Sequence, residues 1–313
     1  MKKTITTLVL LLAVTSLFSQ KLERRHELGL FGGASYYLGD LNENAYLGEL
    51  SPSFGIVYRF LYNDRWAFRI HGKYGTLRGD DADNKKALQS RNLMFKSPLI
   101  EFASLAELNF LPYAPGNSGK RFTPFIFAGV SIFSFNPMAK YDGPWSRTTP
   151  GDPYKGWYEL QPLGTEGQGS TEYPDRKPYA LTQVSIPFGF GIKWNVSNSF
   201  SLGLEWGMRK TFTDYLDDVS TTYVDPEVLK SENTEISMFL ANRSFELDGI
   251  EEYGNQYPEE AAKEMSGMQR GNSENDDWYS FFGITMSFNI KGPRQEDCPA
   301  YKDYNKYKDY YLF

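Results

Sequence analysis

Large apolar side chains alternate with small or polar residues in eight segments of strand length. This period of two is that of a β-strand with one apolar face. The expected strands are about 27–38, 53–62, 66–79, 96–110, 121–136, 179–194, 200–211 and 278–290. In water such faces need a second apolar layer, whereas in a membrane the lipid covers them and a closed barrel pairs every backbone group. The pattern predicts an all-β protein, an eight-stranded antiparallel outer-membrane β-barrel.

The connections between these strands alternate between short and long. Short turns fall at 63–65, 111–120 and 195–199, and long connections fall at 39–52, 80–95, 137–178 and 212–277. Outer-membrane barrels have short periplasmic turns and longer extracellular loops. We therefore expect long extracellular loops and both termini in the periplasm. A short helix is expected at 258–265, where Pro258 occupies a favoured first-turn position.

The two ends of the chain differ from the strand region. Residues 1–19 combine a positive start, Met1-Lys2-Lys3, with an apolar stretch from Leu8 to Phe18, and they are expected to be a signal peptide. Residues 20–291 are expected to form the barrel. Residues 292–313 are rich in Tyr, Lys and Asp and lack alternation, so we expect a periplasmic C-terminal tail.

The composition changes this picture little. Mean hydropathy is −0.50, but barrels dilute their lipid-facing side chains with interior residues and polar loops. The 22 Tyr and 23 Phe fit the aromatic girdles of a membrane barrel. A net charge of −6 argues against a nucleic-acid partner, and the single cysteine, Cys298, excludes an internal disulfide framework.

Charged residues occupy the opposite, inward faces of the expected strands. They are Glu27, Arg59, Arg69, His71, Lys73, Glu101, Glu107, Lys193, Glu205 and Arg209. The interior of an eight-stranded barrel is just wide enough for side chains to fill. Five basic groups face four acidic ones, with His71 uncounted. We expect a nearly neutral plug of structural ion pairs rather than a pore, with Arg69 and Lys73 pairing with Glu101 and Glu107.

Catalytic and ligand-binding patterns are weak. The two histidines are His71, expected in the lumen, and His26, expected before the first strand, whereas a lipid hydrolase needs a Ser–His arrangement at the lipid face. We therefore expect no enzyme activity, no cofactor and no small-molecule substrate.

Acidic and glycine-rich stretches have two interpretations each. Residues 80–83 and Asp217-Asp218 could bind a hard cation such as Ca²⁺, but they lack the spacing of a defined loop, which favours solvated external acid. Gly32-Gly33 and Gly189 with Gly191 are interpreted as small residues in a crowded barrel rather than a phosphate loop.

Aromatic residues crowd the connection 137–178. They are Trp145, Tyr154, Trp157, Tyr158 and Tyr173. They could form a contact surface, since Tyr and Trp are enriched where binding energy concentrates, or a self-packed cap over the barrel mouth. The sequence leaves both possibilities open.

Several segments resemble those of a known family. The similar segments are 26–41, 99–102, 125–130, 205–220 and 298–301. The most specific is the run Arg209-Lys210-Thr211-Phe212-Thr213-Asp214-Tyr215-Leu216-Asp217-Asp218-Val219-Ser220. With these segments the chain resembles the PorG-type, DUF6089-like outer-membrane barrels of the Bacteroidetes.

The resemblance implies an outer-membrane component of the type IX protein secretion system, tied to gliding motility in some members. The implied partners are a PorK/GldK-like lipoprotein and a PorN/GldN-like ring protein in the periplasm, besides outer-membrane lipid. It implies no catalytic residues. The alternative is a surface adhesion or binding barrel that acts through its long loops.

The tail carries the candidate partner contacts. Cys298, Tyr301, Tyr304 and Tyr307 combine the only thiol with tyrosines at roughly helical spacing. Tyr is enriched at interfaces, and an unpaired periplasmic thiol suggests an intermolecular bond or a buried site.

Overall fold

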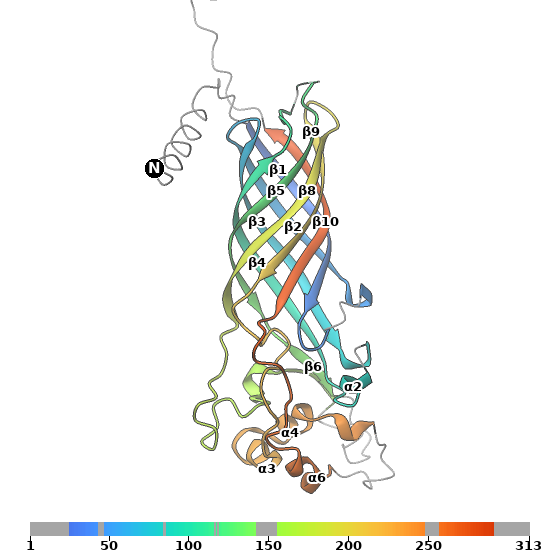
Figure 1. Ribbon diagram of the computed structural model, residues 1–313, viewed down its shortest axis with the longest axis vertical. Helices are drawn as coiled ribbons and strands as arrows, with labels where there is room; N and C mark the ends of the chain where they lie inside the picture. The colour runs from blue at the N-terminus through green and yellow to red at the C-terminus, as the bar shows by residue number, and fades with distance from the viewer. Residues whose placement is uncertain are drawn as a thin grey trace, which may run out of the picture.

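Eight strands close into an antiparallel barrel (Figure 1). The computed structural model describes residues 25–42, 47–83, 86–115, 117, 119–141, 155–247 and 257–290. The barrel strands are β1 (Arg25–Leu38), β2 (Ser51–Leu61), β3 (Trp66–Asp80), β4 (Met94–Asn109), β5 (Phe122–Phe135), β8 (Thr182–Asn195), β9 (Phe200–Lys210) and β10 (Trp278–Ile290). The expected signal peptide and C-terminal tail lie outside the described residues.

Closure comes from the pairing of the first and last barrel strands. β1 pairs β10 from His26 opposite Ile290 to Leu38 opposite Trp278, and β3 pairs β4 in the same antiparallel sense. This arrangement satisfies the backbone without a free edge, as a membrane-spanning sheet requires. The predicted eight-stranded antiparallel barrel is confirmed, with strand ends that differ from the predicted ones by at most three residues.

The outward faces form an apolar belt. Phe102 is 66% exposed and Val130 is 67% exposed, and similar side chains follow on every barrel strand. Apolar surface of this extent around a closed barrel is the lipid-facing surface of an outer-membrane β-barrel. Among the described helices, none is long and apolar enough to cross a membrane.

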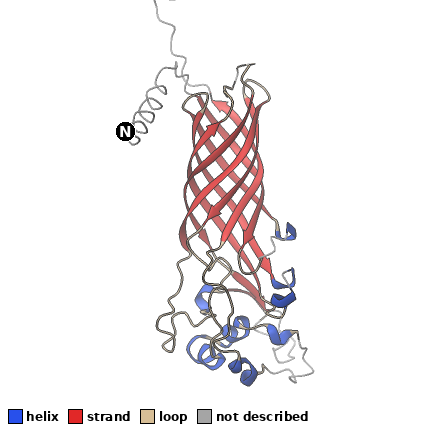
Figure 2. Ribbon diagram, viewed as in Figure 1, coloured by secondary structure: helices blue, strands red, loops and turns tan. Residues whose placement is uncertain are grey.

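The long connections fold into a cap at one end of the barrel, where Figure 2 shows the helices gathered. Two short strands, β6 (Met138–Tyr141) and β7 (Gly156–Glu159), extend the wall beyond β4 and were not predicted. The helices are α2 (Lys86–Gln89), α3 (Pro226–Val228), α4 (Glu235–Ala241) and α6 (Glu259–Glu264), with 3₁₀ turns at Leu47–Glu49, Asp81–Asp83, Gln161–Leu163 and Ser244–Glu246 and a π turn at Leu229–Asn233. The helix expected near Pro258 is confirmed as α6.

One apolar cluster joins the cap-side end of the barrel to the cap. It contains Phe133 and Tyr279 of the barrel wall as well as Leu163, Leu216 and Phe239 of the cap. The rings of Tyr141 and Phe239 stack with centroids 5.3 Å apart. The long connections therefore share a packed core with the barrel.

Of the glycines that the sequence places in a crowded wall, Gly189 and Gly33 are crowded and Gly32 is not. Gly189 leaves room for the ring of Phe127, whose Cζ would lie 2.7 Å from an added Cβ. Gly33 abuts the carbonyl of Phe282 in the same way. Gly32 has nothing within 4 Å of an added Cβ, so the crowding interpretation is wrong for that residue, because its position faces outward.

Candidate functional site

All ten inward-facing charged residues are buried in the lumen, each at most 3% exposed. The set includes Arg69, His71, Lys73, Glu101, Glu107, Glu205 and Arg209. Alternation along each strand explains this placement, because residues two apart share a face. On β3, for example, Arg69, His71 and Lys73 all face the interior.

Glu101 of β4 lies at the centre of the cap-side part of this network. It accepts hydrogen bonds from Arg209 Nε at 2.9 Å and Tyr279 Oη at 2.8 Å, and it contacts His71 Nε2 at 2.8 Å. Because Arg209 also donates through Nη2 at 3.0 Å, four polar atoms from three side chains surround this carboxylate.

Lys73 crosses the lumen instead of pairing with β4. Its Nζ lies 2.8 Å from Glu205 of β9, although the register places it directly opposite Glu101. The predicted pairing of Lys73 with Glu101 or Glu107 is wrong, because Arg209 and His71 occupy the Glu101 oxygens. Arg69 does reach Glu107, at 3.1 Å, and it also pairs with Glu205 at 2.6 Å.

The lumen towards the short-turn end is filled in the same manner. Glu107 accepts from Arg59 Nε at 2.8 Å and from Lys193 Nζ at 2.7 Å. Lys193 also lies 4.4 Å from the centre of the Phe125 ring, and Arg59 bridges Glu107 to Glu27. Paired charges and aromatic rings together occupy the space that a pore would need.

The short-turn end is closed by the turn between β4 and β5. Tyr113 of this turn is 1% exposed, and its hydroxyl donates to Ser201 Oγ at 2.9 Å and lies 3.2 Å from Glu27 Oε1. The sequence predicts only a short connection here. A large aromatic residue beside two Pro was the available signal for a folded-in turn.

Buried aspartates join the cap to the barrel at the opposite end. The Tyr37 hydroxyl lies 2.6 Å from Asp217 Oδ2 and 2.9 Å from Asp277 Oδ1. Burial raises the pKa of Asp214 to about 8 and, with help from Asp40, that of Asp217 to about 8. Burial likewise raises the pKa of Asp277 well above its usual range. Each raised pKa favours the protonated form of the carboxyl group.

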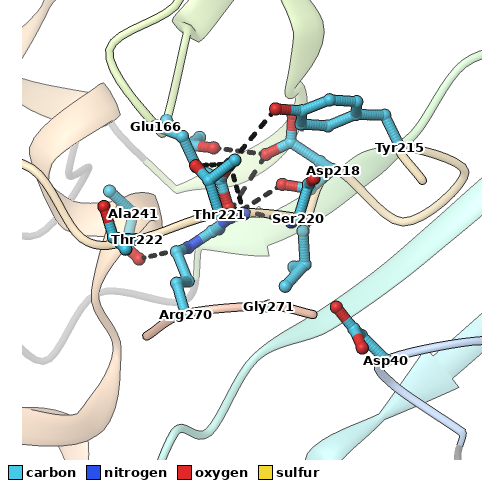
Figure 3. A network of polar contacts seen from close by, with 12 residues as sticks. Asp40, Glu166, Tyr215, Asp218, Ser220, Thr221, Thr222, Ala241, Arg270 and Gly271 are labelled. Carbon is cyan, nitrogen blue, oxygen red and sulfur yellow. Dashed lines mark hydrogen bonds and ion pairs between the residues drawn. The ribbon is translucent and has the colours of Figure 1, made fainter. Parts of the chain in front are cut away.

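Glu166 ties three segments of the cap together (Figure 3). Its carboxylate accepts from the backbone N–H groups of Ser220 and Thr221, each at 3.0 Å, and pairs with Arg270 Nη1 at 2.9 Å. Arg270 also donates to the carbonyl of Asp218 at 2.7 Å. Asp218 adopts a left-handed backbone, with φ 69°, which Asp tolerates better than most residues.

The interpretation of the acidic pairs as solvated is wrong for three residues. Asp217, Asp218 and Asp81 are each at most 1% exposed. Asp81 pairs with Arg91 at 2.7 Å and accepts from the backbone N–H of Leu93. Asp217 and Asp218 are buried by partners far away in sequence, whereas the partners of Asp81 follow 10 and 12 residues later. In the part of the chain that the structure describes, no three His, Cys, Asp or Glu residues are arranged to hold a metal ion.

The two histidines lie apart. His71 is buried in the lumen, and His26 lies inside β1 rather than before it, with Nδ1 2.7 Å from the Tyr58 hydroxyl and its ring against Phe60. Neither histidine is held near a serine in these contacts.

The loop aromatics divide between the two interpretations. Tyr158 and Tyr173 pack against the cap core, whereas Trp157 remains 44% exposed. Trp145 and Tyr154 lie outside the described residues, as do the tail candidates Cys298, Tyr301, Tyr304 and Tyr307.

The closed wall, the apolar belt and the filled interior define a sealed outer-membrane-type β-barrel. The chain matches the profile of the family described as "Domain of unknown function (DUF6089)" over residues 2–144 and 168–239. The chain belongs to this family, and the resemblance to PorG-type barrels is consistent with that membership. The comparison with curated proteins gives no match.

Several solved outer-membrane barrels are similar in structure. Ail of Yersinia pestis, solved with the heparin analogue sucrose octasulfate, has 6% identity and a TM-score of 0.35, with 87% of this chain and 100% of Ail covered. Neisserial surface protein A has 8% identity and a TM-score of 0.35, with 85% of this chain and 97% of that chain covered. OprG of Pseudomonas aeruginosa has 8% identity and a TM-score of 0.32, with 86% and 95% covered. Similarity at this level carries no functional argument.

Proposed function

We propose that the protein is a non-enzymatic outer-membrane component of the type IX protein secretion system, with a part in gliding motility in gliding species. In this proposal it anchors a periplasmic ring of the PorK/PorN or GldK/GldN type to the outer membrane. Family membership and the PorG-like segments support this assignment.

The observation that carries the proposal is the filled lumen. Arg69, Glu101 and Arg209 are fully buried among partners, and Tyr113 closes the short-turn end. A barrel without an open channel is suited to act as a scaffold through its two ends. The short-turn end is the candidate for the periplasmic contact, because short turns of such barrels face the periplasm.

The proposed contact element is the tail, which starts beside that end. Ile290 ends β10 opposite His26 at the beginning of β1, so both ends of the barrel strand set lie at the short-turn end (Figure 1). Cys298, Tyr301, Tyr304 and Tyr307 follow within the next 17 residues of the chain. Tyrosine offers large amphipathic contact area to a partner.

The experiment deletes residues 298–313 while keeping β10 intact. A matched control replaces the same residues with a flexible Gly/Ser segment of equal length, and Cys298→Ser tests the thiol alone. Each variant is purified from cells in mild detergent, and co-purifying envelope proteins and cargo secretion are measured. The deletion and the Gly/Ser control should insert normally but lose the ring lipoprotein. Unchanged co-purification and secretion in the deletion variant would refute the tail contact.

A second candidate function is surface adhesion through the cap. The specific observation in its favour is that the long connections form a packed structure that still exposes Leu247, Met268 and Trp157. Loss of cell-surface binding after substitution of these three residues, with the ring lipoprotein retained, would favour this function.

A further inference from the structure

Two basic residues face each other on the outside of the barrel. Arg78 of β3 is directly opposite Lys96 of β4 in the antiparallel register, and both side chains are exposed. Directly opposite residues have Cβ atoms roughly 5 Å apart, and like charges in such a pair are destabilising. An anion bound between the two side chains would reduce this repulsion.

The pair lies just beyond the apolar belt on the cap side. Tyr74 and Ile100 are opposite each other and face outward, and they are 37% and 47% exposed. Arg78 and Lys96 lie four residues away from them, in the direction of the cap. Four residues span about 13 Å along a strand, or about 10 Å along the membrane normal at the usual tilt of barrel strands. That places the two cations at the level of lipid headgroups.

An aromatic residue flanks the pair. Lys96 Nζ lies 5.7 Å from the centre of the Trp157 ring. Trp157 belongs to β7, which pairs with β6, and β6 pairs with β4 at Lys96. Trp157 is 44% exposed. Exposed aromatic residues next to cations are typical of the interface between hydrocarbon and headgroups.

Among the described residues, the carboxylates near Arg78 form no direct ion pair with it. Glu49 is one of them: burial and the neighbouring Asp83 and Asp80 raise its pKa, and the charge of Arg78 opposes that shift. Glu49 therefore belongs to an acidic group on the cap side of the pair. Within the described ranges, neither Arg78 nor Lys96 forms an ion pair.

We propose that Arg78 and Lys96, with Trp157 beside them, bind the phosphate group of a lipid in the leaflet on the cap side. The guanidinium supplies paired donors that match phosphate oxygens, and the ammonium supplies a compact second charge. The acyl chains of the same lipid cover Tyr74 and Ile100, which distinguishes a lipid from free phosphate. The site is independent of the proposed secretion role.

The test compares Arg78→Gln/Lys96→Gln with a control of equal charge loss, Lys177→Gln/Lys263→Gln, in the cap. The full-length protein is purified in neutral detergent, and its thermal unfolding is followed by Trp fluorescence during titration with three probes. The probes are a diphosphorylated lipid A analogue, its dephosphorylated form and inorganic phosphate. The conservative variant Arg78→Lys/Lys96→Arg keeps both charges and shows whether substitution at this place permits folding.

The phosphorylated lipid should raise the unfolding temperature of the wild type, the control and the conservative variant. The Arg78→Gln/Lys96→Gln protein should bind it about 30-fold more weakly, from the usual contribution of two interfacial cations. Without lipid, this variant should differ little in stability from the wild type, because the repulsion between the two cations is removed together with the attraction between Arg78 and Glu49. The proposal would be overturned if this variant bound the phosphorylated lipid as tightly as the wild type. An equal effect of the dephosphorylated lipid or of inorganic phosphate on the wild type would overturn it as well.

Discussion

Removing the Glu101 carboxylate tests the filled lumen most severely. In Glu101→Ala, Arg209 loses its contacts at 2.9 and 3.0 Å and keeps the carbonyl of Gly207 at 2.6 Å and the ring of Phe281 at 4.7 Å. Tyr279 and His71 each lose a partner as well. Because Arg209 is fully buried, the substitution leaves an uncompensated charge, which costs about 3–5 kcal/mol of unfolding free energy.

Two further variants separate charge from shape. Glu101→Gln keeps the acceptor oxygen and the volume, so it should cost less, about 1.5–3 kcal/mol for a hydrogen bond to a charged group. Glu101→Leu/Arg209→Leu removes both charges. Its loss of unfolding free energy should be about 2 kcal/mol smaller than the sum of the losses in Glu101→Leu and Arg209→Leu, because the two residues are in direct contact. Exposed Glu274→Ala is the control and should change the stability by less than about 0.5 kcal/mol.

Urea unfolding in detergent micelles, followed by Trp fluorescence, gives these free energies. The same preparations are placed in planar lipid bilayers to measure conductance. All variants should remain non-conducting, because Tyr113 and the cap still close the two ends. A loss below about 1 kcal/mol in Glu101→Ala, or porin-like conductance of the wild type, would refute the reasoning about the lumen.

Three further predictions concern the cap. Protease added to intact cells should cut within the loops 137–178 or 212–277 and spare residues 292–313; a tag after Ile290 that can be labelled from outside would contradict the topology. The pKa values of Asp214 and Asp217 are raised from the usual 3.8 to about 8. The contribution of these residues to the stability of the cap is therefore fully present below about pH 4 and is lost as the pH rises through about 8. The protection of cap amides from hydrogen exchange, relative to the intrinsic exchange rate at each pH, should therefore be lower at pH 9 than at pH 6, less so in Asp217→Asn, and equal protection at both values would disprove the linkage. Glu166→Ala removes the carboxylate 2.9 Å from Arg270 and leaves only that of Asp218, 3.9 Å away, so protease should cleave the cap faster than in the wild type while the barrel stays folded; an unchanged cleavage rate would show that Glu166 does not hold the cap.

The barrel could be predicted from the sequence because a period of two assigns each residue to a face. Arg69, His71 and Lys73 were placed in the lumen from alternation alone, and they lie there. Their partners could not be predicted in the same way. Lys73 reaches Glu205 across the lumen, and contacts of that kind depend on strand tilt and on which carboxylates are already occupied.

Local sequence patterns do not predict the fold of the cap. Asp217 and Asp218 look like solvated acid in a loop, but Tyr37, 180 residues away from Asp217, and Arg270 hold them in the interior. The one local signal was their position between Leu216 and Val219, both buried. β6 and β7 were missed because four-residue strands carry too little alternation to be recognised.

Site-specific crosslinking in living cells tests the central claim most directly. A photoreactive amino acid at exposed Asn117 in the β4–β5 turn should crosslink a periplasmic ring lipoprotein of the PorK/GldK type, whereas the same amino acid at exposed Lys177 in the cap should not. Crosslinks to that lipoprotein from residue 117 alone are the predicted result. Crosslinks from residue 177 alone, or from neither position in cells that assemble the ring, would contradict the account.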